Sequence, residues 1–70
     1  MVITDTLLLG QTIKERRKEM GITQLYLSQA TGLSTTFISD VENGKVTAEI
    51  GKVLKLGNIL GMDLKVERRG

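Results

Sequence analysis

Apolar positions recur at spacings of three and four residues over most of this chain, which is the period of an amphipathic helix. In residues 6–20, Leu9, Ile13 and Met20 fall on one stripe, and Arg17 lies on the same stripe. Charged residues occupy the opposite side. This pattern predicts a first helix over residues 6–20, with Gly21 as its C-terminal stop in the manner of a glycine cap.

Three shorter helical segments follow, and small polar residues precede them. Thr23 and Ser34 stand where a hydroxyl would cap a first helical turn, and Thr47 is expected to do the same for the last helix. Glycines or an Asn-Gly pair end the segments. The pattern thus predicts further helices over residues 24–31, 35–42 and 48–60.

The last of these segments is apolar on more than one side. Its expected inward positions are Ile50, Val53, Leu56 and Leu60. Leu54 and Ile59 lie off that stripe and leave a second apolar face without an obvious partner inside the chain.

The period then changes from 3.6 to two. Met62, Leu64 and Val66 alternate with charged residues, which predicts a strand over residues 62–67. A lone strand leaves backbone groups unpaired along both edges, so it needs a partner. That partner is either the N-terminal segment 2–4 or the same strand of a second chain.

We hypothesise symmetric pairing between two chains, with the N-terminal segments adding to the intermolecular sheet. The dimer interface would then be formed by Leu54, Ile59, Met62, Leu64 and Val66.

Composition narrows the class of protein. Seventy residues suffice for one small domain, residues 1–70, and the absence of cysteine and histidine argues against disulfides and a metal site. We expect no cofactor and no enzymatic activity, since there is no nucleophile–base set or phosphate-binding loop. A net charge of +2 permits an anionic polymer as partner without requiring one. No membrane segment or secretory signal is evident, so a cytoplasmic location is expected.

The most informative stretch is residues 32–44, a turn, a short helix and a stop. Together with the preceding short helix it forms two helices joined by a glycine turn, the arrangement of a DNA-binding helix-turn-helix. The combination of two caps eleven residues apart, Gln24 after the first and Glu42-Asn43-Gly44 after the second, carries this interpretation.

These residues resemble the Cro/phage-repressor (XRE) helix-turn-helix family over about residues 9–61. The resemblance is carried by Thr23-Gln24, Leu27-Ser28, Gly32-Leu33-Ser34, Ile38-Ser39 and Val41-Glu42-Asn43-Gly44. The alternating tail is similar to that of a narrower group, the HipB-like antitoxins and their stand-alone repressor relatives. The implied fold is all-α, a four-helix lambda-repressor-like domain with a short C-terminal strand that pairs across a dimer.

The resemblance implies a dimer on a palindromic operator, with the helix over residues 35–42 in the major groove. It assigns the base-reading positions to Thr35, Thr36, Ser39 and Asp40. It assigns phosphate contacts to Gln24, Asn43 and Lys45, and we expect further phosphate contacts from Thr23, Tyr26, Ser34 and Arg16. Gln24 would also brace the recognition helix, and backbone amides of residues 43–45 would face a phosphate.

Two features depart from the family pattern. Asp40 occupies a position that often carries an amide or a basic residue, and its carboxylate is repelled by phosphates although it can accept from cytosine N4. The helix also lacks Arg, Lys, Gln and Asn before Asn43. Base discrimination would therefore depend on threonine methyl contacts, water or DNA shape.

Two other side chains have competing interpretations. Arg17 is either solvated at the edge of its stripe or paired with Glu42. We favour the structural ion pair because both charges face the core, where an unpaired charge is strongly destabilising. Phe37 either packs at a helix edge, touches a thymine methyl or lies at the dimer contact.

The leading expectation is a homodimeric, sequence-specific DNA-binding transcriptional repressor. The alternative is a HipB-like antitoxin that also binds a HipA-like kinase toxin and represses their shared operon. A third hypothesis is a protein-interaction module that kept the fold and lost DNA binding.

Overall fold

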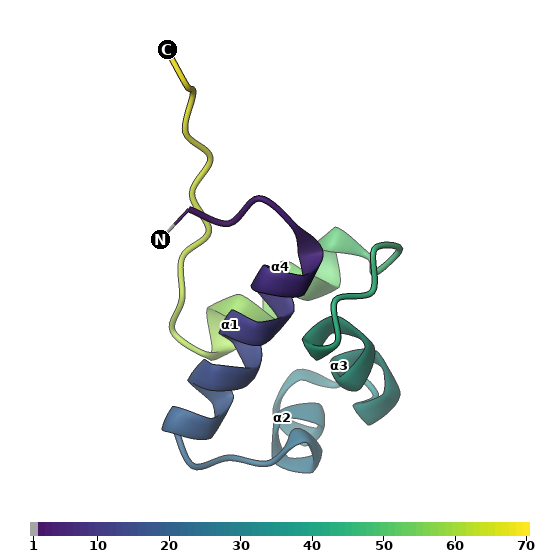
Figure 1. The fold of residues 1–70 in the computed structure, drawn as a ribbon. Coiled ribbons are helices and arrows are strands. Elements are labelled where there is room, and N and C mark those ends of the chain that lie inside the picture. Colours follow the sequence, from purple (N-terminus) through teal and green to yellow (C-terminus); the bar gives the residue numbers. More distant parts are fainter. Residues whose placement is uncertain (1) are drawn as a thin grey trace.

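The computed structural model describes residues 2–70, so Met1 of the expected 1–70 domain lies outside the described residues. Four helices follow one another along the chain: α1 (Thr6–Glu19), α2 (Gln24–Thr31), α3 (Thr35–Glu42) and α4 (Ile50–Ile59) (Figure 1). The all-helical architecture expected from the periodicity is confirmed.

Side-chain caps explain where the first three helices begin. The carboxylate of Asp5 accepts from the amide of Leu8 at 2.7 Å. The hydroxyls of Thr23 and Ser34 each accept, at 3.0 Å, from the amide three residues later. Each cap satisfies one of the amides that the first helical turn leaves without an intrahelical acceptor.

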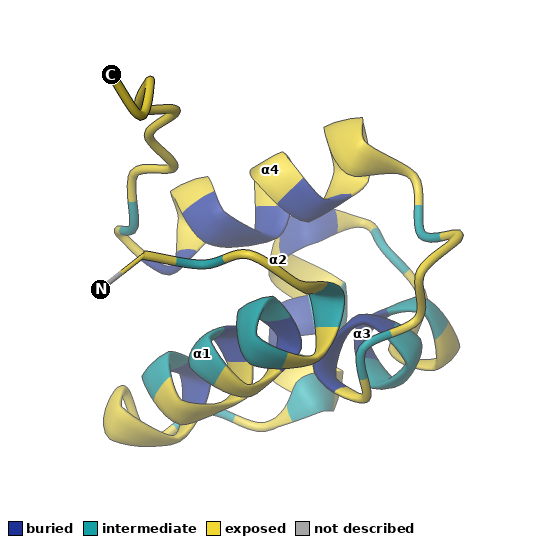
Figure 2. Ribbon diagram, turned by 45° about the horizontal axis from the view of Figure 1, so that its top comes forward, coloured by how far each residue is buried: buried dark blue, intermediate teal, exposed yellow. Residues whose placement is uncertain are grey.

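One apolar core lies between the four helices. α1 packs against α3, while α2 contacts both α3 and α4. In Figure 2 the buried stretches of the helices turn toward this common centre, and the outer side of α4 is exposed. The side chains with no more than 1% of their surface exposed are Ile13, Leu27, Ile38, Leu56 and Leu60.

The start of α4 differs from the expectation. Thr47 does not cap it, because residues 46–47 form a separate turn and the helix begins only at Ile50, after Glu49. Glu49 makes no side-chain cap. The expectation that Ile50 points inward is also wrong, since this first residue of α4 is 66% exposed. Leu54 and Ile59 are exposed, as the second apolar face predicts.

The expected strand over residues 62–67 does not form in the single chain. No residue from 2 to 70 is in a strand, and no backbone hydrogen bond joins segment 2–4 to this tail. The tail runs out from the helices beside the N-terminal segment (Figure 1). A strand is defined by its ladder, and the tail forms no ladder with segment 2–4 within the chain.

None of the helices within residues 2–70 is long and apolar enough to cross a bilayer. The same residues contain no group of acidic side chains arranged to hold a metal ion.

Candidate nucleic-acid interface

One side of α3 is polar and faces solvent. Thr35 and Thr36 are exposed, and Ser39 and Asp40 are half-buried one turn further along. Positions four apart on a helix share a face, so these four side chains form one surface. The opposite side of α3 is buried at Ile38, Val41 and Glu42. The helix is therefore anchored by its apolar side and displays hydroxyl groups and one carboxylate outward.

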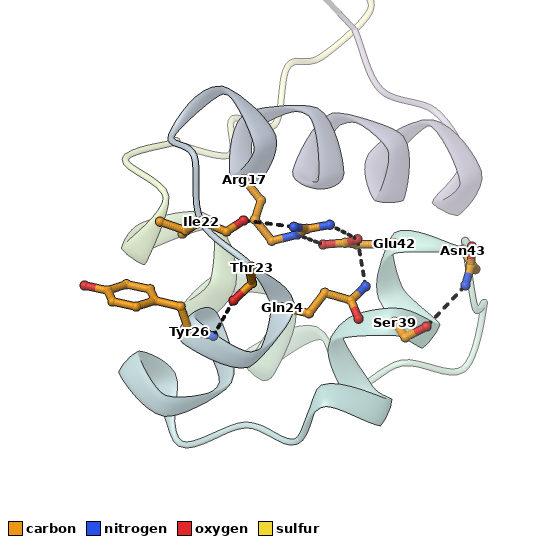
Figure 3. Close-up of polar contacts among 8 residues, drawn as sticks. All are labelled: Arg17, Ile22, Thr23, Gln24, Tyr26, Ser39, Glu42 and Asn43. Carbon is orange, nitrogen blue, oxygen red and sulfur yellow. Dashed lines mark hydrogen bonds and ion pairs between the residues drawn. The ribbon is translucent and has the colours of Figure 1, made fainter.

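Further hydrogen-bond donors surround the starts of α2 and α3. The cap hydroxyls of Thr23 and Ser34 use their oxygens as acceptors, which leaves each O–H free to donate. The amide of Tyr26 is taken by the Thr23 cap, while the amides of Gln24 and Leu25 in the same turn have no intrahelical acceptor, and such amides attract anions. Tyr26 is exposed and points away from the polar contacts at the start of α2 (Figure 3).

A buried charged network connects the first three helices (Figure 3). Arg17 on α1 binds both carboxylate oxygens of Glu42 on α3, with Nε–Oε2 and Nη2–Oε1 distances of 2.7 and 3.0 Å. Its Nη1 donates to the carbonyl of Ile22 at 2.9 Å. Gln24, the first residue of α2, donates from Nε2 to Glu42 Oε1 at 3.0 Å. Arg17 and Glu42 are only 8% and 4% exposed, so the pair is held away from water.

The network controls the charge of Glu42. Burial by itself would raise the pKa of this carboxyl, but the hydrogen bonds from Arg17 and Gln24 and the positive charges of Arg17 and Lys14 bring it below its ordinary value. The hydrogen bond with Glu42 likewise raises the pKa of Arg17. Both groups are therefore ionised at neutral pH.

Close backbone contact also fixes α3 in place. Gly10 on α1 lies so near the carbonyls of Val41 and Glu42 that an added Cβ would overlap them, at 2.8 Å from the Glu42 oxygen. Thr6 donates its hydroxyl to the carbonyl of Gly44 at 2.7 Å. Sequence reasoning missed the role of Gly10, although a glycine inside a helical pattern is a signal of close packing.

The end of α3 differs from the expectation that backbone amides of residues 43–45 are offered to a phosphate. Asn43, Gly44 and Lys45 donate their amides to the carbonyls of Ser39, Val41 and Asp40, at 3.0 Å in each case. These bonds close the helix around Gly44, which has a φ of 85°. The amides already have acceptors, so only the side chains of Asn43 and Lys45 extend the surface here.

Those side chains are themselves engaged. Lys45 Nζ lies 3.3 Å from Asp40 Oδ2. Asn43 Nδ2 lies 3.4 Å from the hydroxyl of Ser39. Two residues assigned to separate roles, base reading for Asp40 and phosphate binding for Lys45, thus form an ion pair.

Arg16 is placed apart from these groups. Its Nε donates to the carbonyl of Leu60, at the end of α4, at 2.9 Å, and its Nη1 lies 3.7 Å from Glu19. This geometry ties α1 to α4, and a phosphate contact by Arg16 stays a prediction. Phe37 packs against the core and lies under the Lys52 ammonium, 5.7 Å from the ring centroid, so edge packing describes it.

The residues expected at a dimer interface lie on α4 and the tail. Met62 and Leu64 border a groove of about 320 Å³ between α1, α4 and the N-terminal segment. Its apolar walls also include Ile3, Leu9 and Val53. Leu54 and Ile59 are nearly half exposed, and Val66 is fully exposed.

Comparison with known proteins agrees with this arrangement. A family model described as helix-turn-helix matches residues 13–66. The chain is 34% identical over 58 residues to the ImmF control region 10 kDa protein of Bacillus phage phi105, a match spanning 83% of this chain and 64% of the phage protein. It is 38% identical over 58 residues to the uncharacterized HTH-type transcriptional regulator y4mF of Sinorhizobium fredii, spanning 83% of this chain and 76% of that regulator.

Solved structures show the same fold. A chain of the HipA-HipB-O2-O3 complex and one of the HipB-O4 20mer complex each superpose with a TM-score of 0.90 at 21% identity, covering 100% of this chain and 99% of theirs. The family match, the two relatives and the two short helices presenting a polar α3 lead to one assignment. The chain belongs to the Cro/phage-repressor (XRE) helix-turn-helix family of DNA-binding transcriptional regulators.

Proposed function

We propose that this protein is a homodimeric, sequence-specific repressor that inserts α3 into the major groove of its operator. The observation that carries the proposal is the two-sidedness of α3. Its inner side is fixed by the core and by the Arg17–Glu42 pair, while Thr35 and Thr36 stand exposed at its first turn. A base-reading helix needs this combination of fixed position and free polar edge.

The side chains of α3 determine what kind of sequence readout is available. Threonine presents a methyl group that fits the thymine methyl and a hydroxyl that bonds either base type, and Asp40 accepts from an amino group. No side chain on the exposed face of α3 can make a bidentate bond to a purine. Specificity would thus arise from several modest contacts, together with the shape of the operator.

Affinity would come from phosphate contacts flanking α3. Donors near its start are the free hydroxyl hydrogens of Thr23 and Ser34, the amides of Gln24 and Leu25 and the side chain of Tyr26. Asn43 and Lys45 supply donors near its end. Gln24 braces α3 through Glu42 and has one amide hydrogen left for a phosphate. Such contacts position the protein and make binding strongly dependent on salt.

The test of base reading is the double substitution Thr35→Ala and Thr36→Ala. We expect it to lower affinity for a duplex selected by the wild-type protein at least about tenfold, as each lost base contact costs about 1–3 kcal/mol. Affinity for a scrambled duplex should change less than about threefold, because phosphate contacts are untouched. Fluorescence anisotropy titrations on both duplexes measure this, and equal losses on the two would refute base reading by α3.

The dimer completes the proposal, since two copies of α3 must reach major grooves about 34 Å apart. We assign the contact to the exposed face of α4 and to residues 62–67, pairing as antiparallel strands about a twofold axis. This gives the alternating tail a partner and covers the apolar side chains that the single chain leaves exposed.

The tail sequence selects one register for this pairing. A twofold axis at Leu64 places Leu64 opposite Leu64 of the partner and Met62 opposite Val66 of the partner, so apolar side chains lie opposite apolar side chains. It also sets Asp63 against Lys65 of the partner, twice per dimer. An axis at Lys65 would oppose two lysines and place Asp63 against Glu67, which like-charge repulsion disfavours.

A second candidate function is that of a HipB-like antitoxin whose dimer also binds a HipA-like kinase toxin. It is favoured by one observation, the superposition of the whole chain on a chain of the HipA-HipB-O2-O3 complex. A kinase-like reading frame beside this gene, whose product co-purifies with the protein, would support this role. A solitary gene would leave the autonomous repressor.

A further inference from the structure

The ion pair between Asp40 and Lys45 lies at the edge of the α3 surface. Lys45 Nζ is 3.3 Å from Asp40 Oδ2, and the two side chains are 53% and 40% exposed. The amide of Lys45 also donates to the carbonyl of Asp40 at 3.0 Å. The turn at Gly44 therefore folds Lys45 back onto α3, and both the backbone and the side chain of Lys45 are held by Asp40.

This pair neutralises the exposed side of α3. The other residues there, Thr35, Thr36 and Ser39, are uncharged. While the pair is closed, the Lys45 ammonium is directed to Asp40 Oδ2 instead of to a phosphate, and that carboxylate oxygen is occupied by Lys45. An exposed pair of this kind is only weakly stable, so a better partner for either group can open it.

The major groove offers such a partner only at certain bases. Cytosine N4 and adenine N6 carry amino groups that donate to a carboxylate, whereas guanine and thymine present only acceptors there, with the thymine methyl. At a base with an amino group, Asp40 exchanges Lys45 for the base. At the other bases the carboxylate has no donor except Lys45.

We propose that Asp40 is a specificity-determining residue that couples base reading to phosphate binding by withholding Lys45. At the correct base Asp40 turns to the amino group, and Lys45 is released to a neighbouring phosphate. On other DNA the pair stays closed, and Lys45 makes no contact with a phosphate. This inference rests on the DNA-binding function proposed above and adds to it a link between two contacts.

The coupling is measured with Lys45→Met on two duplexes, one selected by the wild-type protein from a randomised library and one scrambled. In the wild-type background, Lys45→Met should weaken binding to the selected duplex about fivefold per half-site at about 0.15 M salt, the value for one phosphate contact from counterion release. Binding to the scrambled duplex should change less than twofold. Equal losses on the two duplexes would overturn the coupling.

Asp40→Asn is the complementary variant. It removes the hold on Lys45, so affinity for the scrambled duplex should rise at least about fivefold and its salt slope should steepen by about 0.9 per half-site. In this background Lys45→Met should weaken binding to both duplexes equally. Selection repeated with Asp40→Ala, which has no acceptor for an amino group, should lose the preference for cytosine or adenine at one position of each half-site.

Glu49→Gln is the matched control for charge. Glu49 pairs with Lys52 at 3.4 Å on the surface of α4, so this variant also removes one exposed carboxylate and frees one lysine. We expect less than a twofold change on the scrambled duplex. A gain equal to that of Asp40→Asn would show an effect of net charge alone and refute the role of Asp40.

Failure of this inference is distinguishable from failure of the proposed function. If the wild-type protein binds no duplex in a salt-dependent manner, the DNA-binding function itself is wrong. If the wild-type protein binds selectively but the variants show no difference between duplexes, only the link between Asp40 and Lys45 is wrong. Thermal unfolding of each variant confirms that the fold is intact.

Discussion

Glu42 accepts three side-chain hydrogen bonds, two from Arg17 on α1 and one from Gln24 on α2. A buried carboxylate with these partners is fully compensated, and none of the described buried side chains has an unpaired polar atom. Loss of one member would leave a buried charge alone, which costs far more than an exposed ion pair contributes. At the scale of single residues, the position of α3 therefore depends on this carboxylate.

Glu42→Gln should destabilise the domain by about 3–5 kcal/mol, because the guanidinium of Arg17 remains buried without its counter-charge. Urea or thermal unfolding followed by circular dichroism measures the loss. Glu15→Gln is the control, since Glu15 is an exposed carboxylate on the same α1 that carries Arg17. It should stay within about 0.5 kcal/mol of the wild type, and an equal effect of both variants would contradict the buried pair.

The same carboxyl predicts a dependence on pH. Its pKa is lowered in the folded chain, so on acidification the unfolded chain takes up the proton first and the folded state loses stability. The stabilisation of the fold by ionised Glu42 is complete above the ordinary carboxyl pKa near 4.5, and it is lost as the pH falls through the lowered pKa of the folded chain. Unfolding free energies measured between neutral pH and pH 3 should show this loss in the wild type. Glu42→Gln should lack that component, and an identical acid dependence would assign the loss to other groups.

Part of this site follows from the sequence, and part does not. Arg17 and Glu42 can be paired from sequence because each falls on a buried stripe, where an unpaired charge is too costly. The pairing of Asp40 with Lys45 cannot, since it depends on the left-handed turn at Gly44 that brings the two side chains together. Helical periodicity ends before that turn and gives no information about it.

At the scale of elements, α1 and α3 touch through Gly10. Substitution by alanine has two opposite effects here. Alanine favours a helix by about 1 kcal/mol over glycine, but its Cβ would overlap the carbonyls of Val41 and Glu42. Because those atoms are backbone, α3 as a whole must shift to relieve the overlap.

Gly10→Ala should therefore lower stability by about 1–3 kcal/mol in spite of the better helix former, and should weaken DNA binding by displacing α3. Gly51→Ala on α4 is the matched control, since an added Cβ there has nothing within 4 Å. It should raise stability by up to about 1 kcal/mol. Urea unfolding of the two variants measures both effects, and stabilisation by Gly10→Ala would disprove the close contact.

The elements differ in how far the sequence determines them. α2 and α3 have hydroxyl caps at the residues expected from sequence, because a cap is a local interaction. The predicted start of α4 at residue 48 is wrong because Thr47, the expected cap, lies in the turn formed by residues 46–47. The tail was assigned from its period of two, which describes a strand only when a second strand is present.

At the scale of the whole molecule, the tail pairs with no other strand among the described residues, and the outer side of α4 is exposed. Met62 is half-buried beside the groove, while Leu64 and Val66 are 45% and 100% exposed. A 70-residue domain buries only a modest fraction of its surface on folding, so covering these apolar side chains in a dimer would add to its stability. The same dimer would orient two copies of α3 toward one side of the DNA.

Charge exchange in the tail tests this dimer and its register together. Asp63→Lys sets lysine against Lys65 of the partner at both symmetry-related positions, so the dimer should weaken about tenfold, from roughly 0.7 kcal/mol at each of two positions. Adding Lys65→Asp should restore the dissociation constant of the wild-type dimer, because the pair re-forms with its charges reversed.

Glu67→Lys should have little effect, since this register places Glu67 opposite Gly61. An axis at Val66 would instead oppose Glu67 to Lys65, and Glu67→Lys would then be the damaging variant. Sedimentation equilibrium measures all four proteins, and deletion of residues 62–70 should leave monomers. A dimer that survives this deletion would show that the tail does not join the two chains.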